Sequence, residues 1–382
     1  MKITGARAVL LSHKYPSEPR LEWVGGHIES WDAALVQIGT DEGLTGLGEV
    51  AQGIMGAVAV PGVLDGLLPM LIGQDVADPT GVADDLRDRN VFWARGALCS
   101  GVIAAVEAAC WDVLGKARDK PVYELLGGAQ HDEIELYASG GLGTSFEEVA
   151  SWCAGMHDRG FRTVKFRAQG SPDRTIELLH AVAPSLPDDT QFVLDAVQGC
   201  ARRPWSTNEA VRVGEVVGAL DGRWYEEPAR AEDLDGYAAV RRAVEAPISG
   251  VESYTSSHEF ARLIERDGVD IVQPDAAMVG GPGELRRVAA MAEARGLGCV
   301  PHVWGTAGTI MANLHTAFAT PNMPLFEMCT IPNPLREALF VQPLDITNGR
   351  VHPPTAPGLG IALTDEIEAH FPFIPGGGHV IA

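Results

Sequence analysis

The feature that most limits the fold of this sequence is a series of polar residues that recurs about once per strand-plus-helix unit. The series is Lys165, Asp195, Glu226, Glu252, Asp275, His302 and Glu327. Its intervals are 30, 31, 26, 23, 27 and 25 residues. A (β/α)₈ barrel uses one strand and one helix in each interval of this length. The spacing therefore predicts a barrel in which a polar residue ends each strand.

Short apolar runs precede most of these residues, as is typical of buried parallel strands. Phe192–Leu194 comes before Asp195, and Leu325-Phe326 comes before Glu327. In barrel enzymes, the chemistry takes place at the carboxyl ends of the strands. We therefore expect the polar residues to gather at one face of the barrel.

The composition limits the possible partners and the location of the protein. Lysine and arginine number 29 against 51 acidic residues, and the formal net charge of −22 argues against nucleic acid or an anionic membrane surface as a partner. The six cysteines form no CxxC pair, which is typical of reduced thiols in a cytoplasmic protein. We see no leader peptide and no stretch of about 18 apolar residues, so we expect neither export nor a membrane span.

The 382 residues divide into two patterns near residue 130. Residues 1–50 predict a small antiparallel sheet with strands near 6–11, 33–38 and 44–50, and residues 61–128 predict helices. Beyond residue 130, apolar strand runs alternate with helices. We expect an N-terminal domain at residues 1–130 and a barrel at residues 131–350.

The segment from Ser12 to Ser30 is long for a connection between two strands. Long loops of this kind often cover a binding site. The aromatic residues of the segment favour a lid over a disordered surface connection. Trp23 and His27 are therefore candidate substrate contacts.

Acidic residues follow three successive predicted strands: Asp195, then Glu226 or Glu227, then Glu252. Their carboxylates can meet at one point in the barrel mouth. Each would raise the pKa of the others unless a cation lay between them. Oxygen ligands with room for water and substrate favour Mg²⁺ over zinc. Any one of these acids alone is more often a solvated loop charge, but the shared spacing favours a metal site.

Four further residues are candidates for the chemistry. Lys165 and Arg167 lie two apart on one predicted strand, so both side chains point to the same face, which we expect to be the acidic barrel lumen. Asp275 and His302 end adjacent strands, close enough for the carboxylate to bond one imidazole nitrogen. Such a bond fixes the tautomer and raises the basicity of the imidazole, so His302 is a candidate general base.

Together these motifs resemble the mandelate racemase subgroup of the enolase superfamily over almost the whole chain. The matching motifs are Ala108–Lys116, Leu125–Gly128, Lys165-x-Arg167, Leu194-Asp195, Trp224–Pro228, Gly250–Glu252, Gln273–Asp275, Gly280-Gly281, Pro301-His302 and Phe326-Glu327. The resemblance implies a modified TIM barrel, (β/α)₇β, and an α+β capping domain built from both chain ends, to which residues 351–382 would return. It also implies a homo-oligomer, either a dimer or an octamer.

The resemblance implies three Mg²⁺ ligands, namely Asp195, Glu226 and Glu252. Glu226 is preferred to Glu227 because the ligand of the matching motif lies two residues before the proline. Asp275 and His302 match an Asp-His dyad, and Glu327 matches an acid that hydrogen-bonds the substrate carboxylate or the enolate oxygen. Lys165 matches a lysine that neutralises that carboxylate.

Two positions depart from the family pattern. The second lysine of the KxK motif, usually a base on the opposite face, is Arg167 here, and arginine is a poor proton acceptor because its pKa lies above about 12. The Asp-x-Asn that often follows the third strand reads Asp195-Ala196-Val197, so one expected polar contact to substrate is missing.

The implied chemistry removes the proton α to a carboxylate of a small molecule and forms an enediolate, whose charge Mg²⁺ and Lys165 stabilise. Because His302 is the one obvious base, we favour dehydration of a sugar acid, an aldonate or aldarate, to a 2-keto-3-deoxy product. A racemase or epimerase in which Arg167 acts as a base is an alternative. A catalytically inactive binding protein on the same fold is a further one.

Overall fold

The structure, a computed structural model, describes residues 1–17, 21–23, 26–143 and 145–381. An antiparallel sheet begins the chain. Its strands β1 (Ile3–Lys14), β4 (Ser30–Thr40) and β5 (Thr45–Val50) lie in the order β1-β4-β5. The tight turn between β4 and β5 contains Gly43 at φ 80°, a conformation that favours glycine. All three strands predicted for this region are present.

Helical segments follow this sheet: α1 (Gly53–Gly56), η1 (Ala57–Ala59), α2 (Val60–Leu71), α3 (Pro79–Arg89), α4 (Ala97–Arg118) and α5 (Val122–Leu125). The sheet is contacted by α1, η1, α2 and α4, and α3 and α5 pack against α4. Helix α4 lies against β5 with almost no side chains between the two backbones. A Cβ atom on Gly48 would lie 2.0 Å from the Ala105 carbonyl oxygen, and one on Gly46 would lie 2.1 Å from that of Ala109. These two glycines therefore let the helix contact the sheet directly.

Two helical stretches, residues 53–71 and 97–118, are long and apolar enough to cross a membrane by length and composition. This differs from the expectation that no such stretch occurs. Helix α4 is 78% buried within the window concerned. In α2 the buried residues Val60, Leu64 and Leu67 form part of the core between the helices and the sheet. Packing inside the protein therefore accounts for the apolar residues of α4, whereas the window at residues 53–71 is only 28% buried.

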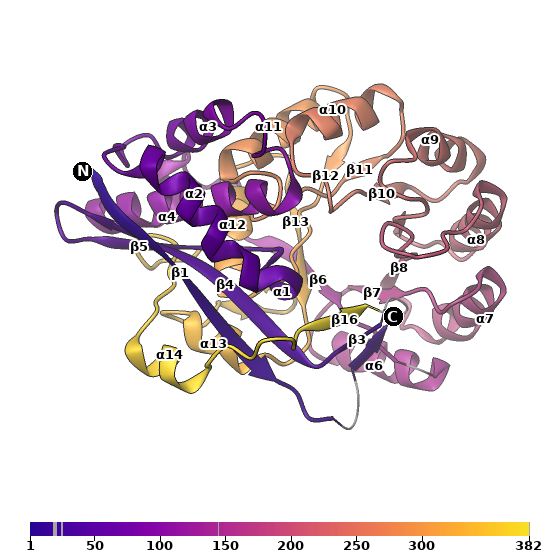
Figure 1. Ribbon diagram of the computed structural model, residues 1–382. Helices are drawn as coiled ribbons and strands as arrows, with labels where there is room; N and C mark the ends of the chain where they lie inside the picture. Colours follow the sequence, from indigo (N-terminus) through magenta and orange to yellow (C-terminus); the bar gives the residue numbers. More distant parts are fainter. Residues whose placement is uncertain (18–20, 24–25, 144, 382) are drawn as a thin grey trace.

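Eight parallel strands form the second part: β6 (Ile134–Ser139), β7 (Thr163–Arg167), β8 (Gln191–Asp195), β9 (Trp224–Glu226), β10 (Ile248–Gly250), β11 (Ile271–Val272), β12 (Gly298–Cys299) and β13 (Leu325–Cys329). Each of β6 to β11 pairs with the next strand along the chain, and β13 pairs with β6. This is the strand arrangement of a barrel, and Figure 1 shows the helices outside it.

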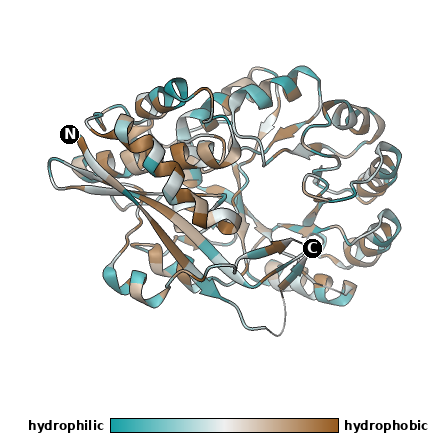
Figure 2. Cartoon of the chain, viewed as in Figure 1, coloured by the Kyte–Doolittle hydropathy of each residue, from teal (hydrophilic) through white to brown (hydrophobic). Residues whose placement is uncertain are grey.

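Seven helices connect these strands: α6 (Phe146–Asp158), α7 (Pro172–Val182), α8 (Thr207–Ala219), α9 (Leu234–Ala243), α10 (Ser257–Glu265), α11 (Pro282–Glu293) and α12 (Ala307–Phe318). The short helix η2 (Ala183–Ser185) follows α7. Figure 2 shows hydrophilic residues on the outer helices and hydrophobic residues at the strands. Eight strands and seven connecting helices among the described residues confirm the predicted (β/α)₇β barrel.

The last part of the chain returns to the first sheet. It contains α13 (Pro334–Leu339), β14 (Ile346–Thr347), β15 (Arg350–Val351), α14 (Asp365–His370) and β16 (His379–Ile381). β15 pairs with β6. β16 pairs with β3 (Gly26–Ile28), which also pairs with β2 (Leu21–Trp23). A small sheet from both ends of the chain thus completes the predicted α+β cap.

Candidate active site

The carboxyl ends of the barrel strands and the cap enclose a cavity of about 620 Å³, a volume typical of small-molecule sites. The polar residues that line it from the barrel are Arg167, Asp195, Glu227, Glu252 and His302. The lining residues from the cap and the chain end include Ile28, Gln52, Ile54, Leu98 and His379. Three members of the predicted polar series, Asp195, Glu252 and His302, therefore meet the cap at one cavity.

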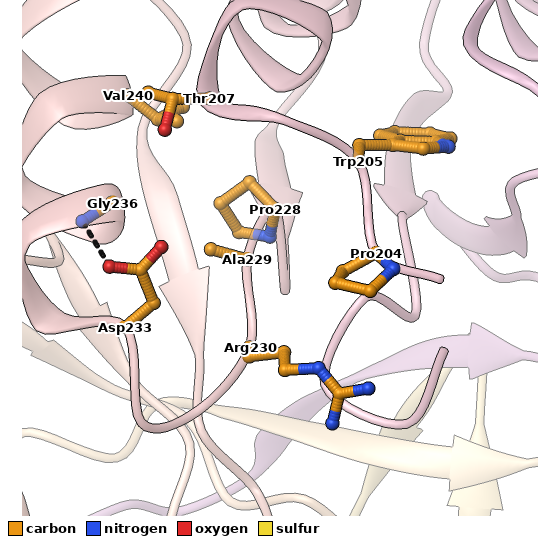
Figure 3. Close-up of a pocket in the computed structure, with 9 residues that line it drawn as sticks. All are labelled: Pro204, Trp205, Thr207, Pro228, Ala229, Arg230, Asp233, Gly236 and Val240. Carbon is orange, nitrogen blue, oxygen red and sulfur yellow. Dashed lines mark hydrogen bonds between the residues drawn. The ribbon is translucent and has the colours of Figure 1, made fainter. Parts of the chain in front are cut away.

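A smaller cavity of about 100 Å³ lies at the start of α8 and α9 (Figure 3). Its charged residues already have partners in the protein. Asp233 accepts a hydrogen bond from the backbone N–H of Gly236, and Arg230 donates to the Ala201 carbonyl oxygen. The smaller cavity therefore holds no cluster of free polar groups, and the larger cavity is the candidate site.

Lys165 lies at the centre of the buried charges behind the cavity. Its Nζ is 2.5 Å from Glu226 Oε1, 2.8 Å from Glu327 Oε1 and 3.8 Å from Asp195 Oδ2. Burial alone would lower the pKa of Lys165, but the charges of Glu226 and Glu327 raise it well above its ordinary value. Burial raises the pKa of Glu327, and the nearby Lys165 ammonium outweighs this and lowers it to about 2. Lys165 and Glu327 thus form a buried ion pair.

Arg167, two residues along β7, is held as a cation at the cavity wall. Its guanidinium carbon lies 4.5 Å from the ring centroid of Trp304, and Nη1 donates to the Gly140 carbonyl oxygen at 2.8 Å. Burial acts to lower the pKa of Arg167, yet the charge of Asp195 and other carboxylates raises it overall. The side chain is therefore suited to bind an anionic or hydroxyl group and not to accept a proton.

Asp275 and His302 form the predicted dyad. His302 Nδ1 lies 3.0 Å from Asp275 Oδ2, and both residues are buried. The other oxygen of Asp275 accepts from the backbone N–H of Ala277 and from Asn313 Nδ2, each at 2.8 Å. With Nδ1 bonded to the carboxylate, Nε2 is the ring nitrogen on the side of Glu252, whose Oε2 is 3.3 Å away.

The charges around His302 also affect its protonation. Burial would lower the pKa of His302, but the carboxylates of Glu252 and Asp275 and that of Glu327 raise it to about 10. Glu327 itself is fixed from a second side, because its Oε2 accepts from the Val303 backbone N–H at 2.7 Å.

Glu226 and Glu227 differ in their surroundings. Both oxygens of Glu226 accept hydrogen bonds from protein groups, namely Lys165, Trp224 Nε1 and Gln273 Nε2. Glu227 instead lines the cavity, and its buried Oε1 has no hydrogen-bond partner. Burial, followed by the charges of Glu252 and Asp195, raises the pKa of Glu227 well above its ordinary value.

Backbone strain accompanies these carboxylates. Val197, Glu227 and Val251 have φ values of 55°, 46° and 67°, and each lies within two residues of Asp195, Glu226 or Glu252. Left-handed backbone is unfavourable for residues other than glycine, especially for β-branched valine. Such strain is concentrated at functional sites, where the surrounding structure holds it in place.

The donor set fits a divalent cation. Six carboxylates surround two permanent cations, Lys165 and Arg167, and the carboxylates are Asp195, Glu226, Glu227, Glu252, Asp275 and Glu327. Burial and the charge of Glu226 raise the pKa of Asp195 to about 7, a sign of uncompensated negative charge. Within the described ranges, no three His, Cys, Asp or Glu side chains are arranged around one point as metal ligands. The Lys165 ammonium contacts Asp195 and Glu226 together.

Two family models match this chain. The N-terminal domain of mandelate racemase / muconate lactonizing enzyme matches residues 15–127, and the enolase C-terminal domain-like family matches residues 148–367. The chain belongs to the enolase superfamily. This agrees with the resemblance found in the motifs.

Relatives of this enolase-superfamily chain include enzymes of sugar-acid metabolism. D-galactarolactone cycloisomerase of Agrobacterium fabrum is 30% identical, covering 97% of this chain and 99% of the relative. Arabinonate dehydratase of Saccharolobus solfataricus is 30% identical, covering 87% of this chain and 88% of the relative. A solved structure of an enolase-superfamily member from Polaromonas sp. JS666 is 30% identical with a TM-score of 0.91, and both chains are covered completely. The fold class is thereby confirmed.

Of the two predicted substrate contacts from the first domain, the structure places only His27, and it lies outside the cavity lining. His27 Nε2 lies 3.1 Å from Glu29 Oε1, and His27 is not among the described residues that line the cavity. Side chains alternate along a strand, and here the neighbouring Ile28 lines the cavity instead. Trp23 ends β2, and its side chain lies outside the part of the protein that the structure describes.

Sequence reasoning missed His379, which lines the cavity from β16. Its Nε2 is 3.4 Å from Trp304 Nε1, its ring centroid is 5.3 Å from that of Trp31, and its buried Nδ1 has no partner. Burial, and then the charge of Arg167, lowers the pKa of His379 to about 4, so the imidazole is neutral near pH 7. No spacing could reveal this residue of the superfamily fold, because its contacts join distant parts of the chain.

Proposed function

We propose that this protein removes the proton α to the carboxylate of a small organic acid, and that it dehydrates a sugar acid to a 2-keto-3-deoxy product. The observation that carries this proposal is the buried Asp275-His302 dyad, 3.0 Å between bonded atoms, opening on a cavity that also contains Arg167 and acidic residues. The relatives named arabinonate dehydratase and L-rhamnonate dehydratase support the same class of reaction.

Mg²⁺ would be held by Asp195, Glu226 and Glu252. The excess of buried carboxylates and the contact of Lys165 with both Asp195 and Glu226 support a cation at this point. When bound, Mg²⁺ supplies positive charge beside the substrate carboxylate and so favours the enediolate. Lys165 would supply a second positive charge there, since it is buried and protonated.

His302 would carry out the proton transfers. His302 must act in its neutral form, and a cation held by Glu252 would favour that form by offsetting the carboxylate charge that raises the pKa of His302. Its Nε2 then takes the proton from C2, while Nδ1–H stays bonded to Asp275. The electron pair from the C2–H bond then forms the C2=C3 double bond, and the C3–O bond breaks. The imidazolium returns its proton to the departing hydroxide, so one water molecule leaves and the enol tautomerises to the 2-keto acid. One histidine thus serves as base and acid.

Arg167 distinguishes this reaction from racemisation. A racemase needs a competent base on each face of the α-carbon. The Arg167 guanidinium is held against Trp304. Burial acts to lower the pKa of Arg167, but the neighbouring carboxylates outweigh this effect and raise it, so Arg167 is a poor base. Racemisation or epimerisation is therefore the weaker alternative. The relative named D-galactarolactone cycloisomerase makes isomerisation of a lactone a second candidate.

The proposal is tested by incubating the protein and Mg²⁺ with a panel of aldonic and aldaric acids, and detecting 2-keto products by NMR in D₂O. We expect at least one acid to yield a 2-keto-3-deoxy product with deuterium at C3. Exchange of the C2 proton without loss of water would favour the epimerase instead. If no acid exchanged or reacted, and Mg²⁺ caused no thermal stabilisation, the binding-protein alternative would be preferred.

Two further expectations belong to this proposal. We place the protein in the cytoplasm, in keeping with its small-molecule acid substrate and dispersed free cysteines. We also expect a homo-oligomer, a dimer or an octamer, which sedimentation would measure.

A further inference from the structure

The part of the cavity beyond the charged residues is mostly apolar. From the cap and the barrel loops it is lined by Ile28, Ile54, Met55, Leu98, Leu142 and Met278. A sugar acid carries a hydroxyl on almost every carbon, and each hydroxyl needs a hydrogen-bond partner. These apolar side chains cannot form such hydrogen bonds. A buried hydroxyl without a partner is destabilising.

Among the described residues that line the cavity, uncharged polar side chains are few. Gln52 lines the cavity with both amide atoms unpaired, and His379 has an unpaired Nδ1. Ser253 and Cys200 also border the cavity. Gln52 and His379 can satisfy one polar substituent on a ligand, but they cannot satisfy a row of hydroxyls.

Val197 adds a second, independent observation. It lines the cavity at the position where the family pattern often has asparagine, and its φ of 55° is strained for a β-branched residue. Its backbone N–H donates to Asp195 Oδ1 at 2.9 Å. Asparagine would tolerate this backbone and offer an amide to the substrate. The chain instead has an apolar side chain here, although the backbone is unfavourable for it.

We propose that the preferred substrate is a 2,3-dihydroxy acid whose chain beyond C3 is an alkyl or aryl group with at most one polar substituent. This rests on the proposed dehydration. The carboxylate and the two hydroxyls meet the charged residues, and the remaining chain contacts the apolar side chains. Since an apolar pocket rejects an added hydroxyl only moderately, by about 10²-fold, selectivity of about 10- to 100-fold over a fully hydroxylated acid is expected.

The test compares 2,3-dihydroxyhexanoate with the hexonate of the same configuration at C2 and C3, all four configurations being tried. With Mg²⁺ present, kcat/KM is measured for each acid, and Kd is measured separately by calorimetry. We expect both quantities to favour the alkyl acid by about 10- to 100-fold. Equal values, or a preference for the hexonate, would overturn the inference.

The two measurements separate this inference from the proposed function. If neither acid is dehydrated but the alkyl acid binds more tightly, the substrate class stands and the dehydration is wrong. If the hexonate is dehydrated faster and binds at least as tightly, the dehydration stands and the substrate class is wrong. If neither acid binds, the substrate class is also wrong.

Variants of Val197 provide the matched control. Val197→Asn relieves the backbone strain and adds an amide, so it should raise the melting temperature and shift the ratio of kcat/KM values toward the hexonate. Val197→Ala removes the apolar contact without adding a polar group. It should therefore lower kcat/KM for the alkyl acid without raising kcat/KM for the hexonate. An unchanged ratio in both variants would contradict a role for Val197 in this selectivity.

Discussion

The hydrogen bonds of Asp275 determine how His302 meets the cavity. Ala277 and Asn313 hold one carboxylate oxygen, and the imidazole is bonded to the other. The ring therefore has a fixed tautomer and a fixed orientation. A neutral asparagine at position 302 would keep much of the side-chain volume but could not carry a proton.

We predict that His302→Asn loses at least about 10³- to 10⁴-fold in kcat while keeping Mg²⁺ binding, because one residue serves two proton transfers. Turnover of the best substrate and thermal stabilisation by Mg²⁺ are the two measurements. Arg167→Met is the matched variant, and it should act mainly on KM. Deuterium exchange at C2 that persisted in His302→Asn would contradict a single-base mechanism.

We also predict that Glu226→Gln weakens Mg²⁺ binding more than Glu227→Gln does. Glu226 pairs in register with Asp195, and Lys165 contacts both carboxylates, so these two carboxylates lie close together. Thermal stabilisation by increasing Mg²⁺ gives the affinity of each variant. A larger loss of Mg²⁺ affinity in Glu227→Gln would show that Glu227, whose Oε1 has no hydrogen-bond partner, is the metal ligand in place of Glu226.

The sequence indicated which charged residues would come together at the strand ends, and their roles stay predictions, but it did not indicate the apolar walls. Lys165, Asp195, His302 and Glu327 could be found because strand ends converge whatever the loops do. His379 could not, since it reaches the cavity only through the pairing of β16 with β3. The contacts of Glu226 and Glu227 also could not be predicted, because they depend on a single left-handed residue after β9.

At the scale of elements, β5 of the cap holds the start of barrel helix α12. The buried carboxylate of Glu49 accepts hydrogen bonds from the backbone N–H groups of Thr306 and Thr309 and from the Thr306 hydroxyl, at 2.7 to 2.8 Å. It therefore caps the helix from another domain. The loop from His302 to Thr306 is fixed by this contact.

We predict that Glu49→Ala destabilises the protein by about 1–3 kcal/mol, because three buried donors lose their acceptor. Urea unfolding measures the change. Glu215→Ala, exposed on α8, is the control and should change stability little. A loss no larger than in the control would show that the carboxylate does not link the two domains.

The order of the elements was predictable because each barrel strand is a short buried run between helices. The strands themselves are shorter than the runs suggested, with only two residues each in β11 and β12. The sheet formed by β2, β3 and β16 was not predicted, since its strands come from opposite ends of the chain. Local patterns do not identify such partners.

At the scale of the whole molecule, His315 joins the barrel, the cap and the C-terminal part. Its Nδ1 accepts from the Tyr123 backbone N–H of α5, and its Nε2 lies 3.4 Å from the Leu359 carbonyl oxygen. Burial lowers the pKa of His315 to about 4. A second ring proton would point at the N–H of Tyr123, so the folded protein favours the neutral imidazole.

We predict that this histidine makes the protein less stable as the pH falls from about 6.5, its unfolded pKa, toward 4. Above pH 6.5, His315 is neutral in both the folded and the unfolded protein. Between pH 6.5 and 4, it binds a proton in the unfolded protein but not in the folded one, so the free energy of unfolding falls by up to about 3 kcal/mol. Denaturant unfolding between pH 4 and 8 tests this. The His315→Gln variant should show a flatter profile, and the exposed His180→Gln should not.

The pairing of β16 with β3 also has a consequence for when the protein becomes active. A ribosome makes β3 early and β16 after every strand of the barrel. A nascent chain can assemble the dyad and the acidic cluster before the wall that contains His379 exists. Catalytic competence should therefore arise only after β16 has left the ribosome, and a premature stop codon shortly before residue 379 would yield a folded barrel whose cavity is open to water.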